Sequence, residues 1–337
     1  MKTKAAVLRN IGGPLTIEEL EIPELGKGQV LVKVLFSGLC HSNINEIKGR
    51  KGAEFIPHLT GHEASGEVLE IGEGVTKVKP GDYVACTWIK GTGLDSPSVK
   101  YLDSNGRIIN AGACSTFIEH AVISENRLVI IPREVKPEVA SILGCAVQVG
   151  AGIVDKHGIG EGHKVAVFGV GGLGASAIMR AASLGVECCA FDVVPWKIKF
   201  AKEELGSAAS VDSNSAEAAQ LKGAFDYSIE CSGNKTAMEM AYEFLKPNGT
   251  AIIAGNLEPG TKISIDYWGL LTGKVLRGTR FDMCIPDQDM PFYSTKYIEG
   301  TLPIGKLISN IYELEYINKG IDDLVAGRLI RGVIKCS

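Results

Sequence analysis

The 337-residue sequence lacks an excess of positive charge and lacks long uncharged segments. Its formal net charge is −4, and lysine and arginine form no run, so nothing favours nucleic acid or an anionic membrane as a partner. The first apolar stretch is short and is broken by Arg9, and no later segment stays uncharged over a membrane-spanning length. We therefore expect a cytoplasmic protein with no membrane or nucleic-acid partner.

A regular cysteine framework is also missing. The nine cysteines are an odd number and are spread over the chain without a repeated spacing. This pattern argues against a disulfide scaffold and for reduced thiols, some of which can bind metal. The chain is longer than the size at which one hydrophobic core keeps growing, so we expect two domains.

Cys40, His62 and Cys145 are the candidate metal ligands. Two thiolates and one imidazole form a ligand set that zinc prefers, and three protein ligands leave the fourth tetrahedral position open for water or substrate. A catalytic zinc ion therefore fits these residues better than a structural one. For isolated residues, a core histidine and inert buried thiols would be the commoner interpretation. The metal is favoured only by the resemblance of the residues around His62 to a family signature, which is described below.

Strand and helix patterns alternate in the second half of the chain, where a predicted strand at Lys164–Phe168 leads into a glycine-rich turn. Gly169 permits a tight turn, Gly171 lets the backbone approach a pyrophosphate, and Gly174 allows close packing of the next helix. The turn runs from Gly169 to Gly174 and includes Gly172, and the helix that follows at 175–184 offers backbone amides to phosphate. The repeated units predict a doubly wound parallel sheet, the Rossmann arrangement.

Asp192 ends the second strand of this region. An acidic group at that point hydrogen-bonds the adenosine ribose 2′-hydroxyl and repels a 2′-phosphate. The sequence therefore predicts NAD rather than NADP as the cofactor.

The first half of the chain contains short apolar stretches separated by glycine turns. Residues 30–36 form a β-branched run that ends at Ser37 and Gly38, and the sequence Pro-Gly-Asp at 80–82 marks another turn. Short strands with frequent glycine turns predict a partly open barrel.

Residues 61–84 resemble the GHExxGxVxxxGxxVxxxxxGDxV signature of zinc-dependent medium-chain alcohol dehydrogenases. The matching positions are Gly61, His62, Glu63, Gly66, Val68, Gly72, Val75, Gly81, Asp82 and Val84. The resemblance implies a β-rich GroES-like catalytic domain at 1–147, a Rossmann NAD-binding domain at 148–280, and a return segment at 281–337 that completes the catalytic domain. It also implies a homo-oligomer, either a dimer or a tetramer.

The resemblance also implies roles for single residues near the metal ligands. Glu63 would lie behind the zinc ion, Ser42 would pass the alcohol proton toward solvent, and Trp88 would form a wall of the substrate pocket. Without the resemblance, Ser42 would be interpreted as a turn residue and Trp88 as a core side chain. Asn43 departs from the family's aspartate, which orients the zinc-bound imidazole, and Asn45 departs from the histidine that ends the proton relay.

For the cofactor, the resemblance implies that Lys197 lies near the adenosine ribose, and that His41 and Arg331 contact the pyrophosphate. The plainer interpretation of Lys197 is a helix-surface lysine, and that of His41 and Arg331 is a solvated charge or a turn residue. Many family members also carry a four-cysteine lobe with a second, structural zinc, but this chain has no cysteine from 87 to 113. We therefore expect one zinc ion per chain and interpret Cys86 and Cys114 as ordinary buried or half-buried thiols.

These observations predict a zinc-dependent oxidoreductase that interconverts an alcohol and an aldehyde or ketone by hydride transfer with NAD. A small-molecule alcohol, aldehyde or ketone would be its substrate. Two alternatives stay open. A polyol or sugar dehydrogenase on the same scaffold is indicated by the missing cysteine lobe and by Asn43 and Asn45. A non-catalytic nucleotide-binding protein is the other, and the complete ligand triad counts against it.

Overall fold

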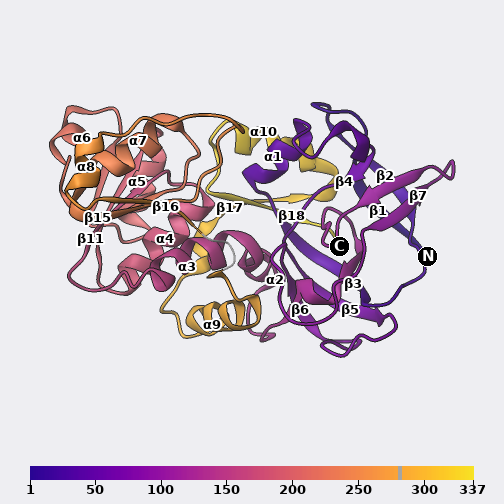
Figure 1. The fold of residues 1–337 in the computed structure, drawn as a ribbon. Helices are drawn as coiled ribbons and strands as arrows, with labels where there is room; N and C mark the ends of the chain where they lie inside the picture. The colour runs from indigo at the N-terminus through magenta and orange to yellow at the C-terminus, as the bar shows by residue number, and fades with distance from the viewer. Residues whose placement is uncertain (280–282) are drawn as a thin grey trace. The chain divides into compact units, whose positions relative to one another are not determined.

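A computed structural model describes residues 1–279 and 283–337 of the chain (Figure 1). The chain forms two compact units. The first comprises Met1–Gln148, Cys284–Gly300 and Ile308–Ser337, and the second comprises Val149–Met283 and Thr301–Leu307. The predicted domain limit between 280 and 281 lies outside the described residues, so the three-part division at 1–147, 148–280 and 281–337 stays a prediction.

The first unit contains a closed barrel. Its strands, in order of pairing, are β1 (Lys2–Leu8), β2 (Leu15–Glu21), β7 (Val99–Asp103), β8 (Ile108–Ala111) and β4 (His58–Leu59). The prediction of a partly open barrel is wrong, because β4 pairs with both β1 and β8 and closes the ring. A strand of only two residues is too short to produce the alternating pattern by which strands are predicted.

The same unit contains a seven-stranded sheet around the long strand β3 (Gln29–Gly38). The order is β10 (Leu128–Ile130), β6 (Tyr83–Cys86), β5 (Ala64–Ile71), β3, β18 (Arg331–Lys335) and β17 (Ile308–Glu313), with β9 (His120–Ser124) paired to β3. Strand β18 lies antiparallel to β3, with Val333 opposite Gly38. The C-terminal strand thus returns to the segment that precedes Cys40.

The helices of the first unit are short and connect these strands. They are α1 (His41–Ile47), α2 (Pro137–Ala140), α9 (Pro286–Ile298) and α10 (Ile317–Val325), with 3-10 turns η1 (Ala53–Phe55), η2 (Glu125–Arg127) and η6 (Leu314–Tyr316) and a π-helical turn η3 (Leu143–Val147). The segment after 285 contains two prolines within α9. Pro286 occupies the first turn of α9, where its missing N–H is not needed, and the helix continues through Pro291.

The second unit is a six-stranded parallel sheet flanked by helices. The strand order is β13 (Ala209–Asp212), β12 (Glu187–Asp192), β11 (Lys164–Phe168), β14 (Phe225–Glu230), β15 (Leu245–Ile253) and β16 (Val275–Gly278). The helices are α4 (Gly172–Ser183), α5 (Pro195–Glu203), α6 (Ala216–Gln220), α7 (Lys235–Glu243) and α8 (Tyr267–Leu271), with α3 (Gln148–Lys156) leading in and a 3-10 turn η5 (Ile304–Leu307). This order is that of the doubly wound dinucleotide-binding fold, so the predicted fold class is confirmed.

Aromatic side chains fill part of the core of this second unit. Phe168 of β11 stacks on Phe191 of β12 with ring centroids 4.7 Å apart, and Phe244 packs edge-on against both. All three are buried. Burial of such rings on neighbouring parallel strands explains why β11 and β12 appear in the sequence as continuous apolar runs.

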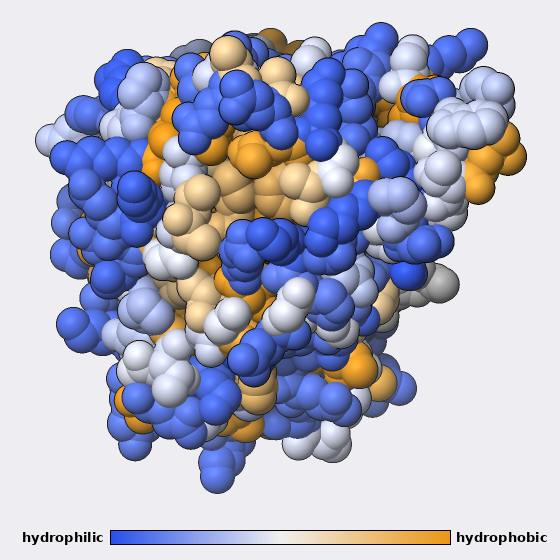
Figure 2. All heavy atoms as spheres, turned by 90° about the vertical axis from the view of Figure 1, so that its left-hand side faces the viewer, coloured by the Kyte–Doolittle hydropathy of each residue, from blue (hydrophilic) through white to orange (hydrophobic). Residues whose placement is uncertain are grey.

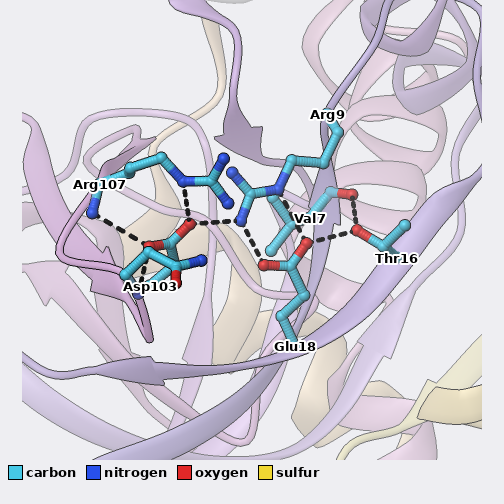
Figure 3. Close-up of polar contacts among 7 residues, drawn as sticks. Val7, Arg9, Thr16, Glu18, Asp103 and Arg107 are labelled. Carbon is cyan, nitrogen blue, oxygen red and sulfur yellow. Dashed lines mark hydrogen bonds and ion pairs between the residues drawn. The ribbon is translucent and has the colours of Figure 1, made fainter.

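A network of charged side chains crosses three segments of the barrel (Figure 3). Arg9, just after β1, donates to Glu18 of β2 and, at 2.7 Å, to the carboxylate of Asp103 at the end of β7. The Arg107 side chain donates to the same carboxylate at 2.9 Å. These partners, Arg9 first among them, hold the pKa of the Asp103 carboxyl well below its usual range.

In the part of the chain described here, no helix has the length and apolar character that crossing a membrane requires.

Candidate metal and nucleotide-binding sites

The three predicted metal ligands come together from three separate elements of the first unit. Cys40 directly precedes α1, His62 lies in the turn between β4 and β5, and Cys145 lies in the π-helical turn η3. Their ligand atoms all lie within 4.8 Å of one another, and each side chain is half-buried. Two sulfurs and one imidazole nitrogen at this spacing fit a zinc ion with an open fourth position.

The thiols of Cys40 and Cys145 differ in the direction of their pKa shifts. A hydrogen bond from the Cys145 thiol is the main cause that lowers the pKa of Cys40 well below its ordinary value, and His62 lowers it further. The same hydrogen bond is the main cause that raises the pKa of Cys145. Thiols bind a metal as thiolates, so binding of a cation to both sulfurs releases protons.

The side-chain amide of Asn43 contacts two of the candidate ligands, Cys40 and His62. Its oxygen accepts a hydrogen bond from the backbone N–H of Cys40 at 2.9 Å, and its nitrogen lies 3.3 Å from Nδ1 of His62. The side chain is fully buried. An amide supports the imidazole without the negative charge that an aspartate would bring, so the ring gains less basicity from this neighbour.

Glu63, the residue after His62, forms a buried ion pair with Arg331. The Glu63 side chain is 0% exposed and that of Arg331 is 5% exposed. Gly38 provides the space for this pair, because a Cβ there would lie 2.5 Å from a Glu63 oxygen and 3.0 Å from an Arg331 nitrogen. Sequence reasoning named both charged residues but missed their contact, which depends on the pairing of β18 with β3.

Ser42 and His41 are exposed on the first turn of α1, and the Ser42 oxygen lies 3.5 Å from the Cys40 sulfur. Trp88 follows β6 and is half-buried. Its indole N–H interacts with the Cys145 sulfur and acts to lower the pKa of that thiol. Trp88 thus lies beside the candidate metal centre rather than in the barrel core, but whether it lines a substrate pocket stays a prediction.

Cys86 and Cys114 lie apart from the candidate ligands. Burial raises the pKa of Cys114 to about 12 and that of Cys86 well above its ordinary value. Such thiols stay protonated and unreactive near neutral pH. Segment 87–113, which contains no cysteine, includes β7 and β8, and the buried carboxylate of Glu125 accepts from the backbone N–H of Leu94 within it at 2.6 Å.

In the second unit, the predicted glycines lie at the turn between β11 and α4. Gly169 has a φ of +93°, and a Cβ there would lie 2.8 Å from the Ser232 side chain. A Cβ on Gly174 would lie 1.9 Å from the carbonyl oxygen of Gly169, whereas a Cβ on Gly171 would meet nothing within 4 Å. Gly172 is the first residue of α4, so the helix begins three residues earlier than the sequence predicted. Gly169 and Gly174 are therefore needed by the fold. Gly171 leaves open space at the helix N-terminus, where a phosphate binds in this fold.

Asp192 holds the glycine turn in addition to ending β12. Its carboxylate accepts hydrogen bonds from the backbone N–H groups of Val170, Val193 and Val194 at 2.6, 2.8 and 3.0 Å. Lys197 is buried, with its nitrogen 5.7 Å from the centre of the Trp196 ring, and burial lowers its pKa. The alternative interpretation of Lys197 as a helix-surface lysine is thus excluded, and its contact with the ribose stays a prediction.

Two family models match the chain. Residues 26–133 match the alcohol dehydrogenase GroES-like domain, and residues 172–291 match the zinc-binding dehydrogenase domain. An S-(hydroxymethyl)glutathione dehydrogenase from Photobacterium damsela subsp. piscicida is 32% identical over 99% of this chain and 100% of its own length. An NDMA-dependent alcohol dehydrogenase from Amycolatopsis methanolica is 33% identical over 99% of both chains.

Solved structures agree with these matches. An alcohol dehydrogenase zinc-binding domain protein from Burkholderia ambifaria superimposes with a TM-score of 0.93 and 27% identity, over 100% of this chain and 99% of that one. Benzyl alcohol dehydrogenase from Acinetobacter calcoaceticus has the same fold, with a TM-score of 0.89 and 24% identity over 100% of both chains. The chain belongs to the zinc-dependent medium-chain alcohol dehydrogenase family. It is a zinc-dependent oxidoreductase of the alcohol dehydrogenase type.

Proposed function

We propose that the protein interconverts an alcohol and an aldehyde or ketone with NAD, and that Cys40, His62 and Cys145 hold its zinc ion. The observation that carries this proposal is the approach of these three ligand atoms to within 4.8 Å of one another. A zinc ion in such a site supplies Lewis-acid polarisation of the substrate oxygen, while the nicotinamide accepts or supplies the hydride.

The surrounding residues orient the ligands and move the proton. Asn43 holds the His62 ring, and Arg331 neutralises Glu63 behind it. Ser42 is the exposed hydroxyl beside Cys40 and takes the proton that the alcohol releases. Asn45 cannot accept that proton near neutral pH, so the proton passes from Ser42 to water.

For the nucleotide, we propose that the open turn at Gly171 and the amides at the start of α4 bind the pyrophosphate. The pyrophosphate contacts of His41 and Arg331 stay predictions. Asp192 and Lys197 bind the adenosine ribose. The Asp192 carboxylate also repels the 2′-phosphate of NADP. The free state of all nine thiols is consistent with a cytoplasmic enzyme.

Metal content tests the ligand assignment. Dialysed protein should contain one zinc per chain, and Cys145→Ser should contain much less, because each ligand contributes to retention. Elemental analysis of both proteins measures this. Two zinc ions per chain in the wild type, or full zinc in Cys145→Ser, would contradict the assignment.

Turnover tests the reaction and the cofactor. A panel of primary alcohols, secondary alcohols, polyols and aldehydes should be assayed with NAD, NADP and, because of the NDMA-dependent relative, NDMA. Highest kcat/KM for a simple alcohol with NAD supports the proposal. A preference for polyols would favour the polyol dehydrogenase alternative, and no turnover with any pair would favour a nucleotide-binding protein.

Asp192 offers a sharper test of cofactor choice. We expect Asp192→Ala to weaken NAD binding and to relax the exclusion of NADP. Since this change also removes the partner of three backbone N–H groups, Asp192→Asn is the matched control, which keeps an acceptor oxygen but no charge. Titration of all three proteins with both cofactors measures the effect. Tighter binding of NADP than NAD by the wild type would refute the role of Asp192.

A further inference from the structure

The carbonyl oxygen of Gly144, directly before the candidate ligand Cys145, is held by two buried side chains. The Thr87 hydroxyl donates to it at 2.6 Å and the Gln148 side-chain amide at 2.5 Å. The same amide nitrogen donates to the Thr87 oxygen at 2.7 Å, so the three groups form a closed ring of hydrogen bonds. Thr87 and Gln148 are both 0% exposed.

The turn that carries Cys145 has unusual backbone geometry. Residues Leu143–Val147 form a π-helical turn, a rare conformation that is frequent at functional sites. Gly144 also packs tightly on the strand end beside it, because a Cβ there would lie 2.0 Å from the carbonyl oxygen of Cys86. The peptide group before Cys145 is thus pressed against the segment that carries Thr87.

The orientation of the Gln148 amide follows from this ring. Its oxygen is buried and has no hydrogen-bond partner among the described residues, a state that costs free energy. Rotating the amide by half a turn would place this oxygen against the Gly144 carbonyl and the Thr87 oxygen, in place of two N–H donors. The two bonds from the nitrogen therefore set the orientation.

We propose that Thr87 and Gln148 are positioning residues for the metal centre. By fixing the Gly144 carbonyl they fix the peptide group that leads into Cys145, and with it the direction in which the sulfur points. This inference rests on the proposed assignment of zinc to Cys40, His62 and Cys145. Partners that orient metal ligands typically change metal affinity by about 10- to 100-fold.

The test compares Thr87→Val, which keeps the shape but removes the hydroxyl, with Thr87→Ser, which keeps the hydroxyl. The rate at which zinc passes to a chromogenic chelator is measured for each purified protein. We expect release from Thr87→Val to be about tenfold faster than from the wild type, and Thr87→Ser to restore the wild-type rate within about threefold. The cobalt-substituted Thr87→Val protein should also show a shifted thiolate-to-cobalt absorption band.

Ser228→Ala is the matched control for a general loss of stability. It removes a buried hydroxyl that donates to a backbone carbonyl at 2.5 Å in the second unit, and it should leave zinc release unchanged. Gln148→Met, which removes the other donor, should reproduce the effect if Thr87→Val does not fold. Release from Thr87→Val or Gln148→Met at the wild-type rate would overturn the inference but leave the ligand assignment intact. Full zinc in Cys145→Ser would overturn both.

Discussion

Ser42 and Asn45 lie on α1, directly after the candidate ligand Cys40. If Ser42 takes the alcohol proton, Ser42→Ala should lower turnover by at least about tenfold, or about 1.4 kcal/mol of transition-state stabilisation, with zinc content unchanged. Asn45→His should raise alcohol oxidation near neutral pH, because an imidazole can accept and hold the proton there. Turnover against pH at saturating NAD measures both. Full turnover of Ser42→Ala across this range would show that another group or water carries the proton.

The glycine turn separates residues that the fold needs from a residue that the ligand needs. Gly171 has extended backbone angles and free space around its Cβ position, so Gly171→Ala should leave the melting temperature nearly unchanged. It should weaken NAD binding by at least about tenfold, because the methyl group occupies the approach of the pyrophosphate.

Gly174→Ala is the comparison for that experiment. Its Cβ would lie 1.9 Å from the Gly169 carbonyl oxygen, so this variant should unfold at a lower temperature whether or not NAD is present. Calorimetry and NAD titration of the two variants separate these effects. Unchanged NAD affinity in Gly171→Ala would argue against pyrophosphate binding at this turn.

At the scale of secondary structure, the charged network at the end of β7 should make the barrel sensitive to acid. The pKa of the Asp103 carboxyl is lower in the folded protein than its value of about 3.9 in unfolded chains. A depressed carboxyl pKa stabilises the fold above the unfolded value, and this stabilisation is lost as the pH falls toward the folded value.

We therefore expect Asp103→Asn to lower the melting temperature at pH 7, with a difference from the wild type that shrinks below about pH 4. Glu19→Gln is the control, because Glu19 pairs with Lys2 at an exposed site where ion pairs contribute little. Thermal unfolding at several pH values measures both. A difference that stays constant from pH 7 to pH 3 would exclude the charge of Asp103 as its cause.

At the scale of the whole molecule, the second unit has an edge suited to a second copy of the chain. Strand β16 ends the six-stranded sheet, and the preceding helix α8 exposes Tyr267, Trp268, Leu270 and Leu271, each by more than half. Figure 2 shows apolar side chains gathered among hydrophilic ones on the side that lies to the left in Figure 1, where α8 is found. Edge-to-edge pairing about a two-fold axis would use the same residues in both copies.

We predict a homo-oligomer, dimer or tetramer, that contains this contact. Leu271→Glu should shift the protein toward monomer in sedimentation experiments, because it places a charge in the paired surface. Leu69→Glu is the control, an exposed leucine on β5 of the other unit, and it should cause no shift. A monomeric wild type would contradict the prediction.

The nucleotide turn could be predicted from the sequence because its chemistry is local, and the candidate metal ligands because their residue types and the family signature around His62 mark them. Zinc selects residue types, and a dinucleotide turn needs glycines at fixed spacing between a strand and a helix. The apolar runs of β11 and β12 likewise predicted buried parallel strands, and the structure has them at the expected residues.

Tertiary structure decided the features that join distant segments. The closure of the barrel by β4, the Glu63–Arg331 pair and the support of the Cys145 turn by Thr87 each depend on segments far apart in the chain. No local pattern marks such contacts, because the partner of a buried polar group is set by packing and not by spacing. The sequence by itself therefore determined the candidate residues for metal and nucleotide binding, and only the packed fold decided which neighbours lie against them.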